Sequence, residues 1–165
     1  MFRRTKCFML AVAIIGMTMN ASAQDLTFST PDGQSVSTSS LRGKVVVLLF
    51  GGAQDPQCRD EFKALQSLSE RYQDKPVSLF WVSINTPAEM SNDKLKAPCG
   101  PTFSVSILRD PGQAAFRKFG GRQLPTFVIL NQEGQIQGQP RGGFNPNTDF
   151  INDIAATIDS LLNRK

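Results

Sequence analysis

The chain has 165 residues, 40% of them hydrophobic, which is enough for one domain with a buried core. It contains no histidine, so hydrolases built on Ser-His-Asp or Cys-His arrangements and metal sites that contain histidine are excluded. The formal net charge is +4, but without Arg3, Arg4 and Lys6 it falls to +1, because 15 basic and 14 acidic residues remain. The composition therefore gives no indication of a nucleic-acid partner or a membrane-surface partner.

The N-terminus has the pattern of a secretory signal peptide. A basic segment, residues 1–6, precedes an apolar run of 11 residues, 7–17, and Ala21-Ser22-Ala23 has the small-x-small pattern of a cleavage site. The run is short for a membrane anchor, and no second run is long enough to span a bilayer. We expect cleavage between Ala23 and Gln24, which leaves a single domain at 24–165. This domain is expected to be periplasmic or secreted and to have no membrane span.

The next residues predict a hairpin, a buried strand and a helix. A Pro-Asp-Gly turn within residues 25–44 separates two short alternating stretches, as in a β-hairpin. The run KVVVLLF, 44–50, is typical of a strand buried on both faces. The helix is expected at 55–72, with Asp55 as the N-cap and Pro56 as the first helical residue.

The rest of the sequence alternates strands and helices. We predict a strand at 76–85, a helix at 88–96, a strand at 105–110, a helix at 112–120, a hairpin from strands at 126–131 and 135–139, and an amphipathic helix at 145–165. This order indicates an α/β domain with a mixed central β-sheet flanked by helices and an N-terminal β-hairpin.

Three segments, in this order, carry a resemblance to a known family. They are RGKVVVLLF before DPQC (55–58), Leu124-Pro125-Thr126, and the NQEGQI hairpin. The sequence resembles the thioredoxin-like redoxins over about 25–163, in particular the TlpA/ResA-like extracytoplasmic thioredoxins, which are related to the AhpC/TSA peroxiredoxins. The resemblance implies a thioredoxin-like fold, a thiol–disulfide oxidoreductase ancestry, and a cis peptide bond before Pro125, facing the active-site helix.

The site departs from the family pattern at its first cysteine. Members of this group carry Cys-x-x-Cys at 55–58, whereas here Asp55 takes the place of the nucleophilic cysteine and only Cys58 remains. Gly51 and Gln54 occupy two positions where the family has Trp. A carboxylate can cap a helix, but it cannot attack a disulfide. We therefore expect at most single-thiol redox chemistry at Cys58, in a weak or divergent thiol oxidoreductase.

Two other functions fit the same residues. One is a catalytically silent module in which the groove beside Pro125 binds an extended peptide or a protein thiol or disulfide partner. The other is a peroxidase, because peroxiredoxins have Thr-x-x-Cys-x-x-Glu here and Cys58 and Glu61 match its last two positions. The peroxidase is less favoured, because Asp55 replaces the family's Thr and Leu124 its Arg, with Arg122 the nearest substitute. No cofactor or metal is expected.

The second cysteine of the predicted mature chain, Cys99, precedes the strand at 105–110. If that strand runs parallel to 44–50, Cys99 should lie at the opposite edge of the sheet from Cys58. A six-residue strand spans about 20 Å, whereas a disulfide needs Cα atoms about 4.4–6.8 Å apart. The expectation is an ordinary loop thiol; a bridge would require the loop to fold back.

Overall fold

The structure is a computed structural model that describes residues 25–52, 56–100, 104–143 and 148–164. The predicted signal peptide and Asp55 lie outside the described residues. Its elements, in chain order, are β1 (Thr27–Ser29), β2 (Ser35–Ser37), the 3₁₀ turn η1 (Ser39–Leu41), β3 (Val45–Gly51), α1 (Cys58–Arg71), β4 (Val77–Ser83), α2 (Asn92–Leu95), β5 (Ser106–Arg109), α3 (Ala114–Lys118), β6 (Thr126–Leu130), β7 (Arg141–Gly142) and α4 (Thr148–Leu162).

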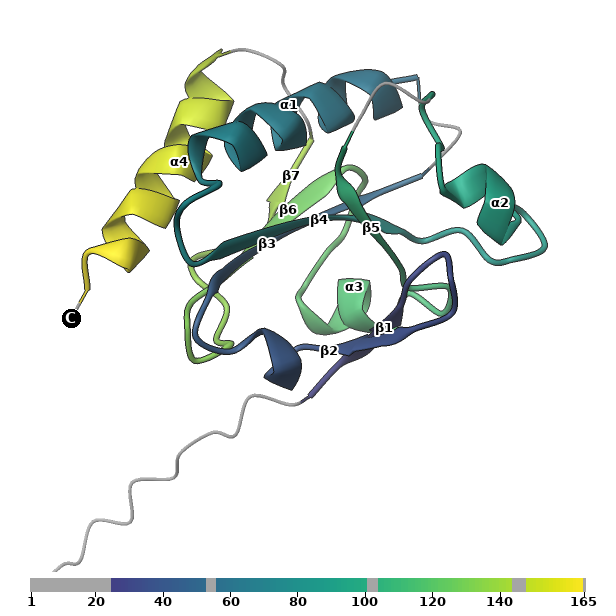
Figure 1. Cartoon of the computed structure of the whole chain (residues 1–165), viewed down its shortest axis with the longest axis horizontal. Helices are drawn as coiled ribbons and strands as arrows, with labels where there is room; N and C mark the ends of the chain where they lie inside the picture. Colours follow the sequence, from purple (N-terminus) through teal and green to yellow (C-terminus); the bar gives the residue numbers. More distant parts are fainter. Residues whose placement is uncertain (1–24, 53–55, 101–103, 144–147, 165) are drawn as a thin grey trace, which may run out of the picture.

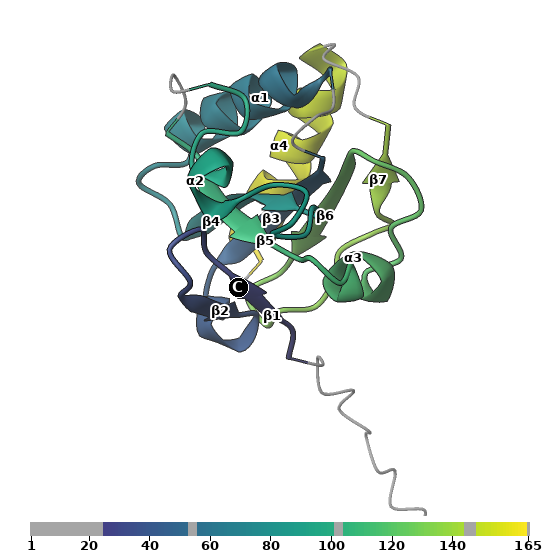
Figure 2. The ribbon, with the colours of Figure 1, turned by 90° about the vertical axis from the view of Figure 1, so that its right-hand side faces the viewer.

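The strands form one mixed sheet in the order β2-β1-β5-β4-β3-β6-β7. Strands β3, β4 and β5 are parallel, while β6 runs antiparallel to β3 and β1 antiparallel to β5. Helices α1 and α4 cover one face and α3 covers the other (Figures 1 and 2), while the β1–β2 hairpin extends the sheet beyond β5. The predicted α/β class, mixed sheet and N-terminal hairpin are confirmed.

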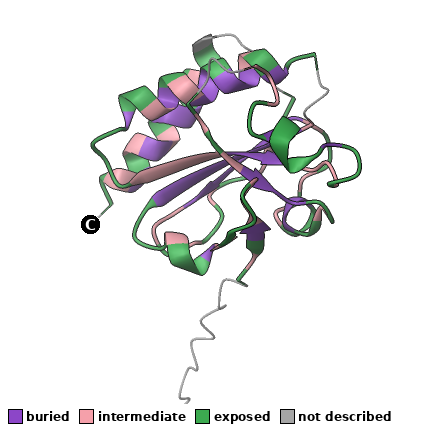
Figure 3. Cartoon of the chain, turned by 45° about the vertical axis from the view of Figure 1, so that its right-hand side comes forward, coloured by how far each residue is buried: buried purple, intermediate pink, exposed green. Residues whose placement is uncertain are grey.

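All seven residues of strand β3 are buried, so this strand lies within the core. Alternate side chains point to opposite faces of a strand. Val45, Val47 and Leu49 join the cluster under α1 and α4, whereas Val46 and Phe50 join the cluster under α3. Figure 3 shows the resulting buried layer through the middle of the molecule. A run of apolar residues without alternation is what a strand with two covered faces requires.

Several predicted elements are shorter in the structure. The helix expected at 88–96 is reduced to α2, which begins at its N-cap Ser91, where the hydroxyl oxygen accepts a bond from Lys94 N–H. The predicted strand 135–139 is wrong: only the bridge between Leu130 and Ile136 forms. Gly138 has a φ of 68°, which ends extended pairing, and β7 follows instead.

No helix among the described residues is long and apolar enough to cross a membrane.

Candidate active site

Helix α1 starts at the edge of the sheet where β3 ends. Its first residue is Cys58, and the N-cap is Gln57 rather than the predicted Asp55. The Glu61 N–H donates to Gln57 O at 3.0 Å, so the helix begins two residues after the predicted first helical residue, Pro56. Cys58, which a start at Pro56 would make the third helical residue, is therefore the first. Cys58 lies in the first turn, where backbone N–H groups lack the acceptor four residues earlier that the helix interior supplies.

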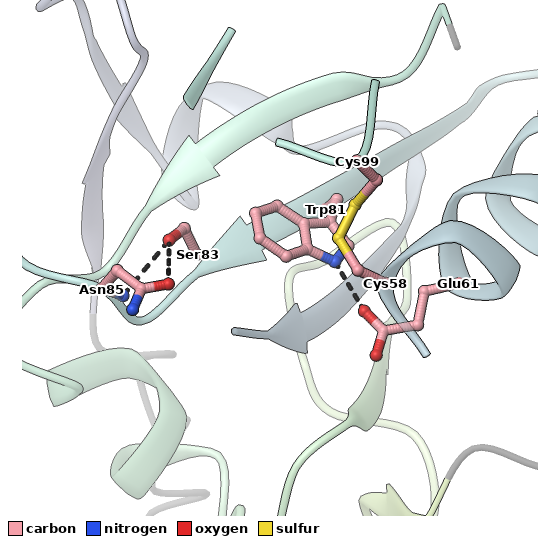
Figure 4. The surroundings of a disulfide bond; sticks show 6 residues. All are labelled: Cys58, Glu61, Trp81, Ser83, Asn85 and Cys99. Carbon is pink, nitrogen blue, oxygen red and sulfur yellow. Dashed lines mark hydrogen bonds between the residues drawn. A yellow bond between two sulfur atoms is a disulfide. The ribbon is translucent and has the colours of Figure 1, made fainter. Parts of the chain in front are cut away.

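Cys58 is bonded to Cys99 in a disulfide with a Cα–Cα separation of 5.9 Å (Figure 4). Cys99 is thus not the ordinary loop thiol that we expected. In this form of the chain the Cys58 sulfur has a partner, so the expected single-thiol chemistry would require reduction of the disulfide first.

The prediction for Cys99 failed because β5 is short. Its four residues pair with the second half of β4, from Phe80–Ser106 to Ser83–Arg109, so β5 does not run the length of the sheet. Cys99 precedes β5 by seven residues, and a chain of that length can span about 23 Å. The segment therefore has enough length to return over the α1 face, where Cys99 packs against the buried cluster.

A buried polar pair lies beside the disulfide. The Trp81 Nε1–H donates to Glu61 Oε2 at 2.8 Å, and both side chains are fully buried (Figure 4). Glu61 is one helical turn after Cys58, whereas Trp81 comes from the neighbouring strand β4. The Trp81 ring also packs on Phe62, with ring centroids 5.1 Å apart. The pair fixes the first turn of α1 against the sheet.

Gly51 makes room for this pair. A Cβ at this position would lie 2.6 Å from Glu61 Oε2 and 2.8 Å from Trp81 Nε1. The glycine at a family Trp position is therefore a site of close approach, which a larger side chain could not occupy without displacing the pair.

Pro125 lies at the same edge of the sheet as the start of α1. The Leu124–Pro125 peptide bond is cis, as the resemblance implied. Pro125 directly precedes β6, in which Thr126 pairs with Phe50 near the end of β3. The Pro125 carbonyl accepts a bond from Gly143 N–H at 2.9 Å. The next residue, Thr126, lines a cavity of about 450 Å³ together with Gly120, Arg122, Gln123, Gln139, Pro140 and Gly142.

Arg122 therefore lies in the wall of this cavity rather than at the disulfide.

Within the described ranges, no three His, Cys, Asp or Glu side chains gather closely enough to hold a metal ion.

Sequence reasoning missed two parts of the site. These are the polar partner of Trp81 and the pairing of Cys99 with Cys58. The signal for the disulfide was present, since these are the two cysteines that remain in the predicted mature chain, and exported proteins favour pairing. No comparable sequence pattern predicts the hydrogen bond between Glu61 and Trp81.

The mixed sheet, with α1 and α4 on one face and α3 on the other, is the fold of a thioredoxin-like protein. The model of the AhpC/TSA family matches residues 19–139, and the chain belongs to this family. It is 30% identical over 125 residues to the thiol-disulfide oxidoreductase ResA of Halalkalibacterium halodurans, covering 74% of this chain and 69% of ResA. It is also 30% identical over 127 residues to the thioredoxin-like protein YneN of Bacillus subtilis, with 74% and 71% covered.

Solved structures show the same fold. A putative thiol:disulfide interchange protein DsbE from Chlorobium tepidum superposes with a TM-score of 0.69 at 20% identity, covering 86% of this chain and 95% of that one. A putative protein disulfide isomerase from Bacteroides thetaiotaomicron gives a TM-score of 0.68 at 24% identity, covering 87% and 89%. The thioredoxin-like fold and the redoxin family are thus confirmed.

Proposed function

We propose that the protein is an extracytoplasmic thiol–disulfide oxidoreductase whose redox pair is Cys58–Cys99. The observation that carries this proposal is the disulfide at the first turn of α1, in a chain of the AhpC/TSA family. Asp55 occupies the position of the first cysteine of Cys-x-x-Cys, so Cys58 has no partner within that motif. Cys99, in the loop after α2, supplies the second sulfur. The pair can then accept two electrons from a dithiol or return them to a disulfide.

The test is native exchange with a dithiol. The oxidised protein is mixed with an unfolded peptide that carries two reduced cysteines, and peptide oxidation is followed by mass spectrometry. We expect a peptide disulfide to form as the protein disulfide is reduced, and the variant with both Cys58→Ser and Cys99→Ser to be inactive. A wild-type disulfide that resists native exchange contradicts the proposal.

A silent binding module is the second candidate. It is favoured by the burial of Cys58, which is only 5% exposed, since such a disulfide can serve as a structural link. In this case the exchange assay stays negative, and an extended peptide binds beside Pro125 equally well in the oxidised and reduced protein.

The peroxidase is tested with hydrogen peroxide. If the reduced protein consumes peroxide and the Cys58→Ser variant does not, the activity is that of a peroxidase instead.

Export is part of the same proposal. Residues 1–23 act as a signal peptide, and the named relatives that share this family include a ResA protein. Expression of the full chain should yield an exported product beginning at Gln24, read by N-terminal sequencing. A product that keeps residues 1–23 and remains in the cytoplasm contradicts it.

A further inference from the structure

We propose that Cys99 is the sulfur at which the pair exchanges with a protein dithiol, and that Cys58 is the leaving group. This assignment rests on the proposed function. It reverses the order expected from the sequence, in which Cys58 was the only reactive thiol, and it places the exchange sulfur outside the four-residue motif of the family.

The first argument is access. Cys58 belongs to the buried cluster that includes Phe62 and Trp81, and only 5% of its surface is exposed. Cys99 is partly buried and packs against the rim of the same cluster. Its neighbours Pro98 and Gly100 are also partly exposed, so the loop offers an approach from solvent. A protein thiolate, which is bulky, can therefore reach Cys99 before Cys58.

The second argument concerns the leaving group. Cys58 is the first residue of a helix of 14 residues, where the helix dipole and first-turn N–H groups favour a thiolate. Such a sulfur leaves more readily in thiol–disulfide exchange. Cys99 follows the four-residue α2 and has no such helix.

Two carboxylates in the first turn of α1 oppose a negative charge at Cys58, and the charge of one of them, Asp60, is offset by a lysine. Asp60 is exposed to water and pairs with Lys63 at 3.1 Å. Glu61 accepts the Trp81 N–H. The helix terminus favours Cys58 as the departing thiolate, whereas its burial and the nearby Glu61 oppose the charge, so the assignment rests on the access to Cys99.

The exchange balances as follows. A substrate thiolate attacks Cys99 Sγ, a new S–S bond forms to the substrate, and the Cys58–Cys99 bond breaks with its electron pair going to Cys58. The second substrate thiolate then attacks the substrate sulfur of this mixed disulfide, and Cys99 leaves as a thiolate. The substrate dithiol is oxidised to a disulfide by two electrons, and the protein pair is reduced and takes up protons from water.

The experiment traps the mixed disulfide in the wild-type protein. Oxidised protein is mixed with the two-cysteine peptide, quenched with N-ethylmaleimide during the reaction, and digested for mass spectrometry. We expect the peptide on Cys99 and the maleimide on Cys58. Peptide found on Cys58, with maleimide on Cys99, overturns the assignment while leaving the proposed function intact. A wild-type protein that does not exchange at all overturns both.

Single variants give an independent measurement. Cys58→Ser leaves Cys99 as the free thiol, and Cys99→Ser leaves Cys58. With glutathione disulfide under native conditions, Cys99→Ser should form the mixed disulfide about tenfold or more slowly than Cys58→Ser, because of burial. In denaturant this difference of rates should disappear. A faster native reaction of Cys99→Ser contradicts the assignment, and circular dichroism establishes that both variants are folded.

Discussion

Gly51 is the residue on which the packing beneath the disulfide depends most directly. Its missing side chain lets Glu61 and Trp81 meet at 2.8 Å between Oε2 and Nε1, in a site with no exposed surface. A buried carboxylate oxygen needs a hydrogen-bond donor, and Trp81 supplies one to Glu61 Oε2, so the small residue and the polar pair belong together.

Gly51→Ala should therefore lower the free energy of unfolding by about 1–3 kcal/mol, because the new Cβ must displace the pair. The matched control is Gly52→Ala, where a Cβ would meet nothing within 4 Å and the change should be about 0.5 kcal/mol or less. Urea unfolding, followed by the fluorescence of the single tryptophan, measures both. Equal stability of the two variants contradicts the packing argument.

Tyr72, the only tyrosine, offers a prediction about pH. Its hydroxyl lies 3.0 Å from Ala155 O and 2.9 Å from Asp159 Oδ1. Burial, followed by the bond to Asp159, raises the pKa of Tyr72 to about 12 from 10.0. Since the folded state prefers the neutral phenol, this contribution to stability is complete below pH 10 and is lost as pH rises through about 12.

Ionisation of Tyr72 should lower the free energy of unfolding by about 1–2 kcal/mol, after allowance for solvent screening. Unfolding in urea between pH 10 and pH 12 measures it, and Tyr72→Phe should remove this part of the slope. Phenolate absorbance of the native protein gives the titration directly. A midpoint at the ordinary value would contradict the predicted shift.

At the scale of the secondary-structure elements, the segment that connects β4 to α2 is held in place by one buried arginine side chain. Arg109, at the end of β5, is 2% exposed, and burial lowers its pKa. Its guanidinium donates to Asn85 O at 2.7 Å, Met90 O at 2.8 Å and Asn92 Oδ1 at 3.1 Å. These bonds hold the segment that leads to Cys99 against the end of the sheet.

Arg109→Lys keeps the charge but loses the fork geometry, so we expect a loss of about 1–3 kcal/mol in the free energy of unfolding. Amide hydrogens at 84–92 should also exchange faster with solvent. Arg117→Lys, at an exposed arginine on α3, is the control and should change stability by about 0.5 kcal/mol or less. Unchanged exchange in Arg109→Lys is the result that would refute this role.

The order of the elements was predictable from the sequence, but the exact length of each element was not. The apolar run of β3 and the turn in the β1–β2 hairpin act locally, so their patterns predict them well. The start of α1 was misplaced because Asp55 and Pro56 have strong preferences for helix starts, yet the regular bonding begins later. Cys99 was misplaced because the reach of its loop depends on how much of β4 the strand β5 covers, which is a tertiary property.

For the whole molecule, the disulfide joins residues 41 positions apart. Closing a loop of this length restricts the unfolded chain, which corresponds to about 4 kcal/mol in the chain-entropy model. Reduction should lower the free energy of unfolding in urea by this order. The variant with both cysteines replaced by serine should match the reduced wild type and be insensitive to reductant. If reduced and oxidised protein unfold at the same urea concentration, the link does not stabilise the fold.

The disulfide also has a consequence for a broken backbone. Residues 91–94, 96 and 97 are exposed, as a protease requires, and all lie between the two cysteines. A single cut there leaves the two fragments covalently joined through sulfur. The nicked chain would therefore migrate at full mass on a gel without reductant and separate into two fragments with it, so a cut in the segment around α2 leaves the protein as one covalent molecule.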